Sequence, residues 1–360
     1  MNVAIVGPGG IANTHAAALA QLKQNLVMVV GRDAAKAKAF AETWGAAASS
    51  TKLEDALGPG VDVVHLCTPP ALHYAMAKDI LAAGKHLVCE KPLTLSADEA
   101  KELVALAKEK KVLAAVNFNV RFHEACGRAK AAVADKSFGD VQLIHGTYFQ
   151  EFHLLPADYM WRYIPQLGGK MRAVTEIGSH WIDLARFWTG LEINAVCATL
   201  GRFNPKRMLD GGMMYPEGHK GGEEVEVGSE DAAAVTFRFE NGALGSMLLS
   251  EVSSGRSNYL SMEVSSGNAA VWWNSEDPYR LNEASGKFAG AKTTVNAFGG
   301  GFPDTFSAFF GKVYGALKAG QYEMDGADYP TLQDGFVNAA VCDAIWQSAH
   351  SKSAWTEVSY

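Results

Sequence analysis

The stretch Asn2-Val3-Ala4-Ile5-Val6-Gly7-Pro8-Gly9-Gly10-Ile11-Ala12 decides the fold of the first part of this 360-residue chain. A short, mostly apolar strand runs directly into a glycine-rich turn, and a helical pattern follows at once. The spacing G-x-G-x-x-A in this context is typical of a dinucleotide-binding turn. A plain strand-to-helix turn that uses glycine only for its geometry is the alternative.

Each small residue of the turn has a physical reason. Gly7 permits the tight bend, Gly9 lets backbone approach a pyrophosphate, and Ala12 keeps the helix close to the sheet. The start of the helix offers backbone N–H groups and a positive dipole end to the phosphates. The residues that we expect at the phosphates are Gly7, Gly9, Gly10, Ile11 and Ala12.

Strand and helix patterns alternate through the first 120 residues. The expected strands are 2–6, 26–30, 62–66, 86–89 and 112–116, and the expected helices are 11–22, 34–43, 71–83 and 96–110. The strands are near-continuous apolar runs, as expected where helices cover both faces of a sheet. Alternation of this length predicts a right-handed, doubly wound parallel sheet. We therefore expect an α/β protein whose residues 1–120 form a dinucleotide-binding Rossmann domain.

The pattern changes after residue 120. A helix at about 121–134 and another at 176–188 accompany longer alternating segments, at 140–150, 193–201, 231–239, 244–252, 258–265 and 268–273. These segments predict a large, open, mainly antiparallel sheet with one covered face. Residues 121–360 are thus expected to form an α+β domain for substrate binding and oligomerisation. The glycine-rich, acidic stretch 202–230 is expected to be an exposed loop. Late helices at 304–318 and 331–350 finish this domain or pack back on the first.

Composition excludes several classes of protein. Hydrophobic residues make up 48% and charged residues 20%, and the net charge of −7 argues against a nucleic-acid partner. No apolar run is long enough to span a membrane. The five cysteines form no CxxC pair and the chain starts without a signal pattern, so we expect a cytoplasmic protein with reduced thiols. The ten histidines form no metal motif, so no metal is expected.

The run Cys89-Glu90-Lys91-Pro92 follows the expected strand 86–89. Lys91 therefore lies at the carboxyl end of a parallel strand, at the edge where open α/β sheets bind ligands. The turn at Gly7 is expected to open onto the same crevice. A lysine and a dinucleotide site in one crevice indicate redox chemistry, although a surface lysine at a helix start is the alternative.

The end of the second strand bears on the choice between NAD and NADP. An NAD site usually has an acid there, which accepts a hydrogen bond from the ribose 2′-hydroxyl. Here the acid position is occupied by Gly31, and Arg32 follows. A guanidinium pairs well with a 2′-phosphate, so the pattern favours NADP over NAD. Asp33 serves as the acid if the strand ends later, and Arg32 then only stacks on adenine.

Glu176, His180 and Asp183 are spaced at i, i+4 and i+7, so on a helix they share one face. Histidine is the usual group for proton transfer near neutral pH. Gly178 removes a side chain between them, which would let a ligand or backbone approach. An ordinary polar face, a buried His–Asp pair and a metal site are the alternatives.

Several of these motifs occur together in a known order. They are the GxGxxA turn, Glu90-Lys91-Pro92, Trp161-Arg162, Gly168-Gly169 and Glu176-Ile177-Gly178-Ser179-His180. In this order and at this separation they resemble the Gfo/Idh/MocA family of oxidoreductases, which includes inositol and glucose–fructose dehydrogenases. The resemblance runs the whole length of the chain.

The resemblance implies roles for individual residues. Lys91 would hydrogen-bond the reacting substrate oxygen near the nicotinamide, His180 would be the general acid/base, and Asp183 would orient His180 or bind a hydroxyl. Glu176 stands where the family commonly has Asp, so its role is less defined. The residues that would line the cofactor cleft are Thr68, Pro69, Pro70, His73, Glu90, Lys91, Trp161 and Arg162. An ordinary core aromatic is the alternative for Trp161.

The predicted activity is hydride transfer between a nicotinamide, NADP or NAD, and a secondary hydroxyl or ketone of a sugar, polyol or related compound. The first alternative is transient redox, in which a retained cofactor assists epimerisation or glycoside cleavage. The second is a non-catalytic nucleotide or sugar sensor. The open sheet predicts a homodimer or homotetramer.

Overall fold

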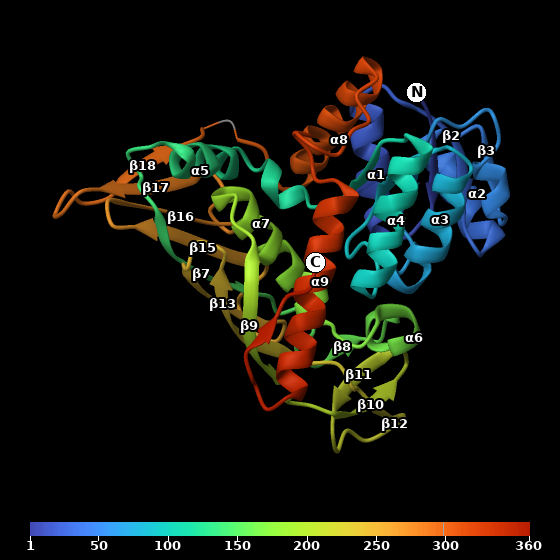
Figure 1. Ribbon diagram of the computed structural model, residues 1–360. Helices are drawn as coiled ribbons and strands as arrows, with labels where there is room; N and C mark the ends of the chain where they lie inside the picture. Colours follow the sequence, from blue (N-terminus) through green and yellow to red (C-terminus); the bar gives the residue numbers. More distant parts are fainter. Residues whose placement is uncertain (298) are drawn as a thin grey trace. The chain divides into compact units, whose positions relative to one another are not determined.

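The computed structural model describes residues 1–297 and 299–360, and the chain divides into two compact units (Figure 1). Unit 1 comprises Met1–Phe122 and Gly301–Ala339, and unit 2 comprises His123–Gly300 and Ala340–Tyr360. The last helix, α9 (Leu332–His350), therefore contributes residues to both units. The assignment of cofactor binding to 1–120 and of substrate binding and oligomerisation to 121–360 stays a prediction.

Unit 1 is built on a six-stranded parallel sheet in the order β3-β2-β1-β4-β5-β6. Its strands are β1 (Asn2–Val6), β2 (Asn25–Val30), β3 (Ala48–Ser50), β4 (Val63–Leu66), β5 (His86–Cys89) and β6 (Ala114–Val116). The predicted doubly wound parallel sheet is confirmed. The short edge strand β3 was not predicted, because its three small residues show no hydrophobic pattern.

Helices cover both faces of this sheet. They are α1 (Gly10–Gln21), α2 (Ala34–Trp44), α3 (His73–Ala82), α4 (Ala97–Lys110) and α8 (Phe302–Ala319), with short 3-10 turns at Leu53–Ala56, Pro70–Leu72 and Asn119–Phe122. Alternate residues of β1 enter opposite cores. Ala4 and Val6 pack in the core that includes residues of α3 and α4, whereas Val3 and Ile5 pack in the core that includes α1, α2 and α8. Burial on both faces explains why the strand sequence is continuously apolar.

Unit 2 is built on a nine-stranded sheet in the order β18-β17-β16-β15-β7-β14-β13-β9-β19. Its strands are β7 (Val141–Phe149), β9 (Ile193–Gly201), β13 (Ala232–Phe239), β14 (Leu244–Ser250), β15 (Tyr259–Ser266), β16 (Ala269–Asn274), β17 (Arg280–Ser285), β18 (Lys292–Val295) and β19 (Thr356–Glu357). Neighbouring strands are antiparallel except for the parallel pair β7 and β14. The predicted large, mainly antiparallel sheet is confirmed.

Helices α5 (Glu124–Ala134) and α7 (Ser179–Thr189) lie on one face of this sheet (Figure 1). Trp181 of α7 stacks on Phe237, with ring centroids 5.5 Å apart. A Cβ on Gly178 would lie 2.7 Å from the Leu249 side chain. The expectation that Gly178 makes room for a ligand or for backbone is therefore wrong, because it lets the start of α7 approach a leucine of β14 instead.

The expectation of a loop at 202–230 is also wrong. The stretch contains β10 (Lys206–Asp210), β11 (Met213–Pro216) and β12 (Glu223–Glu226), which form a small sheet with β8 (Ala157–Asp158). Gly211 and Gly212 connect β10 to β11 and both have positive φ, 59° and 87°, as a tight hairpin turn requires. These strands are short and largely polar, so they carry little hydrophobic alternation. Short helical turns at Trp161–Tyr163 and Pro165–Gly168 follow β8.

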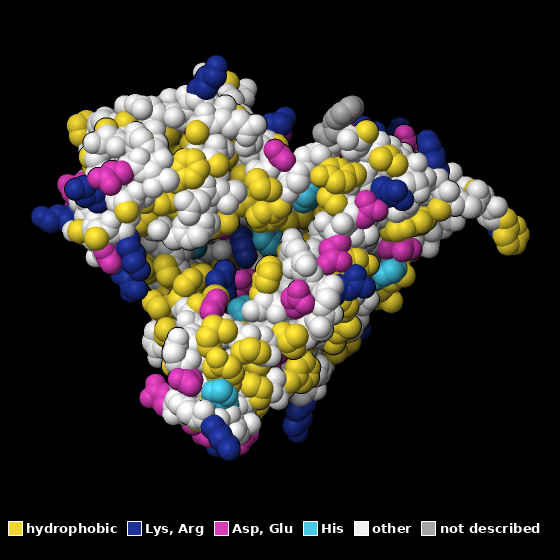
Figure 2. Space-filling model, turned by 180° about the vertical axis from the view of Figure 1, so that it is seen from behind, with side chains coloured by type: hydrophobic (Ala, Val, Ile, Leu, Met, Phe, Trp, Pro, Cys, Tyr) yellow, Lys and Arg dark blue, Asp and Glu magenta, His cyan; other side chains and the backbone are white. Residues whose placement is uncertain are grey.

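Among the described residues, no helix is both long and apolar enough to cross a membrane. All five cysteines are free thiols, and four of them are buried. Figure 2 shows hydrophobic atoms at the end of a projecting arm of the molecule. Phe288 lies between β17 and β18 of unit 2 and is almost fully exposed.

Candidate active site

Gly7 follows β1 and has φ +90°, a backbone conformation that residues with a side chain rarely adopt. A Cβ at this position would lie 2.8 Å from the backbone of Cys67 and of Thr68, at the end of the neighbouring strand β4. The Gly7 N–H donates to Val30 O at 2.8 Å, which ties the turn to β2. The turn thus requires glycine for two reasons, its backbone angle and the close approach of β4.

The next two glycines are different. A Cβ on Gly9 or on Gly10 would meet nothing within 4 Å, and both residues are exposed. Helix α1 begins here, and no side chain caps its first N–H groups. Packing within the protein does not demand these glycines, so an open cradle of backbone N–H groups remains, as a bound diphosphate requires. Ile11 is half-buried and Ala12 is fully buried, as the predicted helix–sheet contact demands.

The end of β2 carries no acid at the predicted position. Gly31 is buried, and a Cβ there would lie 2.8 Å from the Pro8 ring, so no acidic residue fits without moving Pro8. Arg32 is exposed. Asp33 is the N-cap of α2, where its Oδ1 accepts from the N–H groups of Ala35 and Lys36. The hydrogen bond from the Lys36 N–H is the largest cause that lowers the pKa of Asp33.

The turns after β4 and β5 are joined by a buried imidazole. His73 has one ring nitrogen 2.8 Å from Pro92 O and the other 2.7 Å from Thr68 O. Burial lowers the pKa of His73 and thus favours the neutral ring, which carries one N–H and therefore donates to only one of these two carbonyl oxygens. The structure therefore places His73 beneath the two turns, where it links them. Thr68 and Pro69 are half-buried and Pro70 is buried.

Glu90 directs its carboxylate into unit 1. Its Oε1 accepts from His15 Nε2 at 2.8 Å and from Asn117 Nδ2 at 2.5 Å, and its Oε2 accepts from the Lys91 N–H at 3.2 Å. Burial by itself would raise the pKa of Glu90, but these hydrogen bonds and nearby positive charge outweigh it, so the pKa is lowered. Lys91 is half-buried. Because β1, β4 and β5 are neighbours, Gly7, Thr68 and Lys91 follow strands that end at one edge of the sheet.

In unit 2 the predicted trio does not lie on a uniform α-helix. Val174–Gly178, which contains Glu176, is a π-helical turn, and α7 begins after it. His180 and Asp183 are buried in α7 at i and i+3, so these two share a face. The wider π turn offsets Glu176 from the position that an i, i+4 spacing predicts. π turns of this kind occur frequently at functional sites.

Glu176 is held by two side chains that sequence reasoning did not assign to it. Its Oε1 pairs with Arg162, whose guanidinium stacks 4.5 Å from the Trp161 ring centroid. Its Oε2 lies 3.7 Å from Nε2 of His153. His153 is buried, and its Nδ1 is hydrogen-bonded to the Tyr163 hydroxyl. Trp161 and Arg162, predicted at the cofactor, thus form one group with Glu176 inside unit 2.

A buried ion-pair cluster continues from His153. Its Nε2 lies 3.9 Å from Glu251 Oε2, and Arg172 pairs with Glu251 and with Asp231, both at 2.6 Å. Arg207 reaches Asp231 at 2.8 Å. Burial is the largest cause that raises the pKa of Glu251 well above its usual range and lowers the pKa of His153.

One group of three described residues has metal-like geometry. Ligand atoms of His153, Glu176 and Glu251 all lie within 4.8 Å of one another. Two guanidinium groups already pair with these carboxylates, Arg162 with Glu176 and Arg172 with Glu251. Their positive charge opposes a divalent cation at the same oxygens. The arrangement therefore fits an ion-pair cluster better than a metal centre.

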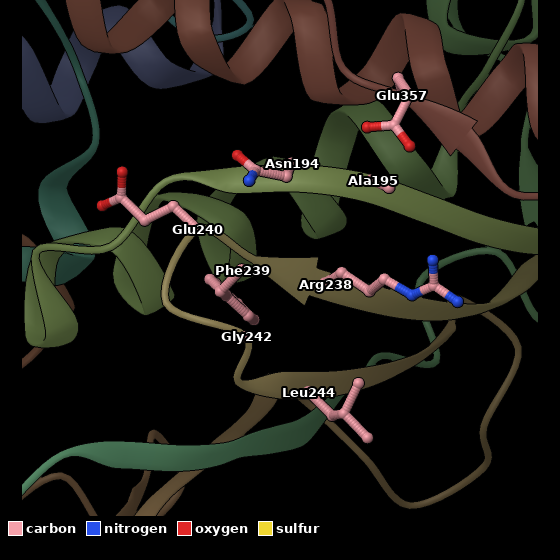
Figure 3. Close-up of a pocket in the computed structure, with 8 residues that line it drawn as sticks. All are labelled: Asn194, Ala195, Arg238, Phe239, Glu240, Gly242, Leu244 and Glu357. Atoms are coloured by element: carbon pink, nitrogen blue, oxygen red, sulfur yellow. The ribbon is translucent and has the colours of Figure 1, made fainter.

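A cavity of about 360 Å³ opens at the ends of β9, β13 and β14 (Figure 3). It is lined by Asn194, Ala195, Arg238, Phe239, Glu240, Gly242, Leu244 and Glu357. Figure 3 shows the polar ends of Arg238 and Glu240 pointing in different directions, and Arg238 stacks on Trp355 at 4.1 Å. The cavity contains none of the predicted site residues. The polar groups of a ligand site usually converge on one point, and those of this cavity do not.

Comparison with known proteins agrees with this geometry. Residues 1–118 match an oxidoreductase family with an NAD-binding Rossmann fold, and residues 127–270 match the GFO/IDH/MocA C-terminal domain. The fold and its dinucleotide turn thus define an NAD-binding oxidoreductase. The chain belongs to the Gfo/Idh/MocA family, as the order of its motifs predicted.

Two curated relatives illustrate the chemistry found in the family. Levoglucosan dehydrogenase of Pseudarthrobacter phenanthrenivorans is 30% identical over 325 residues, covering 83% of this chain and 80% of the relative. Inositol 2-dehydrogenase of Rhizobium meliloti is 30% identical over 209 residues, covering 58% of this chain and 61% of the relative.

Solved structures agree over the full length. A levoglucosan dehydrogenase in complex with NADH superimposes with a TM-score of 0.91 at 26% identity, covering 100% of this chain and 99% of that one. The complex with NADH and levoglucosan gives 0.90 at 26% identity and covers 100% of both chains.

Proposed function

We propose that this enzyme oxidises a secondary hydroxyl of a sugar or polyol, or reduces the corresponding ketone, with a nicotinamide cofactor. The observation that carries the proposal is the combination of an open glycine cradle after β1 with Lys91 after β5, at one edge of the sheet. The likeness to levoglucosan and inositol dehydrogenases supports a cyclic polyhydroxylated substrate.

We assign each step to residues of this chain. The Gly9 N–H already donates to Gly7 O at 2.8 Å, so the backbone N–H groups at Gly10 and the start of α1 hold the diphosphate of NAD, which supplies the hydride acceptor when it is bound. As the carbinol carbon loses hydride, its hydroxyl proton passes to a ring nitrogen of His180. The Lys91 ammonium stabilises the negative charge that develops on the substrate oxygen. Asp183 orients His180 from the same face of α7, and Glu176, held by Arg162, contacts a neighbouring hydroxyl.

The central test is substitution of the two groups that act on the substrate oxygen. Lys91→Ala and His180→Ala should each reduce kcat by about a hundredfold or more, because each removes a proton-transfer or electrostatic contribution of that size. Binding of NADH, measured by fluorescence titration, should change little. Lys110→Ala and His350→Ala replace exposed side chains and serve as matched controls. Full turnover in both site variants would refute the assignment.

We also propose that the enzyme accepts NADP as well as NAD. The acid position after β2 is Gly31, Pro8 blocks any side chain there, and the Asp33 carboxylate is engaged as a helix cap. Exposed Arg32 is then available to a 2′-phosphate. Arg32→Ala should raise KM for NADP about tenfold or more, with little effect on KM for NAD. An equal effect on both cofactors would leave Arg32 as an adenine-stacking residue.

The substrate is best sought by absorbance at 340 nm with levoglucosan, inositols and common pyranoses, each with NAD and with NADP. Net formation of reduced cofactor supports the dehydrogenase reaction. Product formation from a retained cofactor without a net absorbance change would instead favour transient redox.

We propose, finally, that unit 2 mediates a homodimer or homotetramer. The sheet face opposite α7 exposes Leu143, Leu244 and Leu248, on the adjacent strands β7 and β14. Apolar side chains on a broad sheet face commonly meet a second copy of the same chain. Light scattering after size exclusion tests this, and Leu248→Glu should shift the mass toward the monomer.

A further inference from the structure

Unit 1 contains a continuous chain of hydrogen bonds that the proposed reaction does not use. The Tyr314 hydroxyl lies 2.8 Å from His65 Nε2, and His65 Nδ1 lies 2.8 Å from His15 Nδ1. His15 Nε2 in turn lies 2.8 Å from Glu90 Oε1. All four residues are buried, and they come from α8, β4, α1 and the turn after β5.

The chemistry of the groups determines the direction of each hydrogen bond. An ionised carboxylate only accepts, so His15 must donate from Nε2 to Glu90. In a neutral ring the Nδ1 of His15 is then an acceptor, so His65 donates from its Nδ1 and accepts at its Nε2 from the Tyr314 hydroxyl. Burial raises the pKa of Tyr314 and lowers that of His65, so the phenol keeps its proton and the His65 ring stays neutral. With both rings neutral, every proton in this series of hydrogen bonds points toward Glu90.

The series of hydrogen bonds continues to the backbone of Lys91. Glu90 uses Oε1 for His15 and Asn117, which leaves Oε2 to accept from the Lys91 N–H. Burial is the largest effect on the pKa of Glu90 and raises it. His15 and Asn117 lower the pKa, and the charge of Lys91 lowers it further. Glu90 is thus coupled to Lys91 both by a hydrogen bond and electrostatically.

We propose that His15, His65 and Tyr314 are positioning residues for Lys91, because they keep the Glu90 carboxylate ionised and fixed against the Lys91 turn. The catalytic importance of this arrangement rests on the role proposed above for Lys91. The arrangement itself can be tested without turnover. None of the three residues belongs to a motif of the family pattern quoted above.

The other titratable groups near the chain do not compete with Lys91 for the Glu90 charge. The thiols of Cys67 and Cys89 face Glu90, and burial raises the pKa of both, so they stay neutral. His73 also faces Glu90, and burial lowers its pKa. Asp62 acts on Tyr314 at the far end of the chain. Phe306 and Phe310 pack on the imidazole rings and exclude water from them.

The consequence of breaking the chain follows from the burial of Glu90. A buried carboxylate that loses its donors favours the protonated, neutral form. The Lys91 ammonium would then lose the stabilising negative charge of Glu90 and release its proton at a lower pH. The effect should be largest when His15 is removed, because it is the direct donor, and smaller when Tyr314 is removed, because two links then remain.

The experiment measures the reactivity of Lys91 in the cofactor-free protein. Wild type, Tyr314→Phe, His15→Leu and His15→Gln are pulse-labelled with acetic anhydride from pH 6 to pH 10.5, and acetylation of Lys91 is read by mass spectrometry. Exposed Lys110 is the internal reference. Tyr329→Phe is the matched control. Tyr329 is a buried tyrosine of the same unit that takes no part in this series of hydrogen bonds.

We expect Tyr314→Phe to move the Lys91 labelling midpoint about half a pH unit lower, or about threefold more labelling below the midpoint. His15→Leu should move it further, and His15→Gln should restore part of the shift because its amide donates to Glu90. Unchanged profiles in folded Tyr314→Phe and His15→Leu would overturn the proposal, as would an equal shift in Tyr329→Phe. If His15→Leu does not fold, Tyr314→Phe decides. An active Lys91→Ala enzyme would refute the catalytic role while leaving this result standing.

Discussion

Each unit buries a network of titratable side chains behind a predicted catalytic residue, but the two networks differ in charge. In unit 1, two imidazoles and a phenol lead to a single carboxylate, Glu90. In unit 2, Arg172 lies among several buried carboxylates, including Asp231 and Glu251. The first network is a line of hydrogen bonds between mostly neutral groups, and the second is a cluster of guanidinium and carboxyl groups.

This difference in charge determines how each network responds to the loss of one of its side chains. A neutral hydrogen bond contributes about 1 kcal/mol, so loss of one link in unit 1 alters position and protonation more than stability. A buried ion pair balances a large desolvation penalty, so loss of one partner leaves an uncompensated charge. We therefore expect substitutions in unit 1 to appear in the chemistry of Lys91 and substitutions in unit 2 to appear first in folding.

The largest expected effect is that of Arg172→Met in unit 2. It leaves the buried Glu251 carboxyl without its guanidinium and leaves Asp231 with Arg207 alone, and should reduce the free energy of unfolding by about 3–5 kcal/mol. Arg256→Met is the matched control, because Arg256 pairs with Glu276 in a half-exposed site. It should cost less than about 1 kcal/mol in urea denaturation. Equal losses in the two variants would contradict the expectation that burial makes the Arg172 cluster sensitive to the loss of one partner.

The next effect concerns pH, and the two networks should respond with opposite sign. His65 has a lowered pKa in the folded state, so its contribution to stability is present above pH 6.5 and is lost as the pH falls below it. Glu251 has a raised pKa in the folded state, so folding gains stability as the pH falls from that raised value toward 4.5. Each group changes the free energy of unfolding by at most about 1.4 kcal/mol per pH unit.

Denaturation of variants at pH 7.5 and 5.5 measures this. The destabilisation caused by His65→Asn should shrink at the lower pH, whereas that caused by Glu251→Gln should grow. The same sign for both variants would contradict the assignment of a neutral imidazole to one network and a proton-binding carboxyl to the other.

The smallest effect tests whether the unit 2 cluster reaches the reaction through His153. His153→Gln should lower kcat about threefold, because Glu176 loses one of the groups that hold its carboxylate. In a Glu176→Gln background the same change should have little further effect, since coupled residues are not additive. Additive losses in this double-mutant cycle would mean that His153 acts independently of Glu176. His350→Gln, at an exposed position, is the control.

Much of the fold of unit 1 could be predicted from the sequence, because the patterns that indicate its strands and its turn lie within short segments. Buried parallel strands are continuous apolar runs, and the Gly7 turn carries its own geometric requirement. In unit 2 the alternation along β13 and β14 similarly predicted strands with one covered face. The β10–β12 sheet was not predicted, because its short polar strands carry no such alternation.

The π turn at Val174–Gly178 could not be predicted either. The spacing of Glu176, His180 and Asp183 fits an α-helix well, and nothing in the local sequence signals an extra residue per turn. A close contact of Gly178 with Leu249, 71 positions away, accompanies this turn. The packing that accompanies this turn therefore involves a residue far away in the sequence, which the local sequence does not reveal.

The sequence by itself determined the family, the parallel sheet, the glycine cradle and Lys91 at a strand end, because each depends on residues close together in the chain. Only the tertiary structure decided which titratable groups meet. His65 and Tyr314 are 249 positions apart, and helix α7 and the strands β9 to β14 lie between Arg172 and Glu251 in the sequence. Burial then sets their proton affinities, and burial belongs to the folded chain and not to any segment of it.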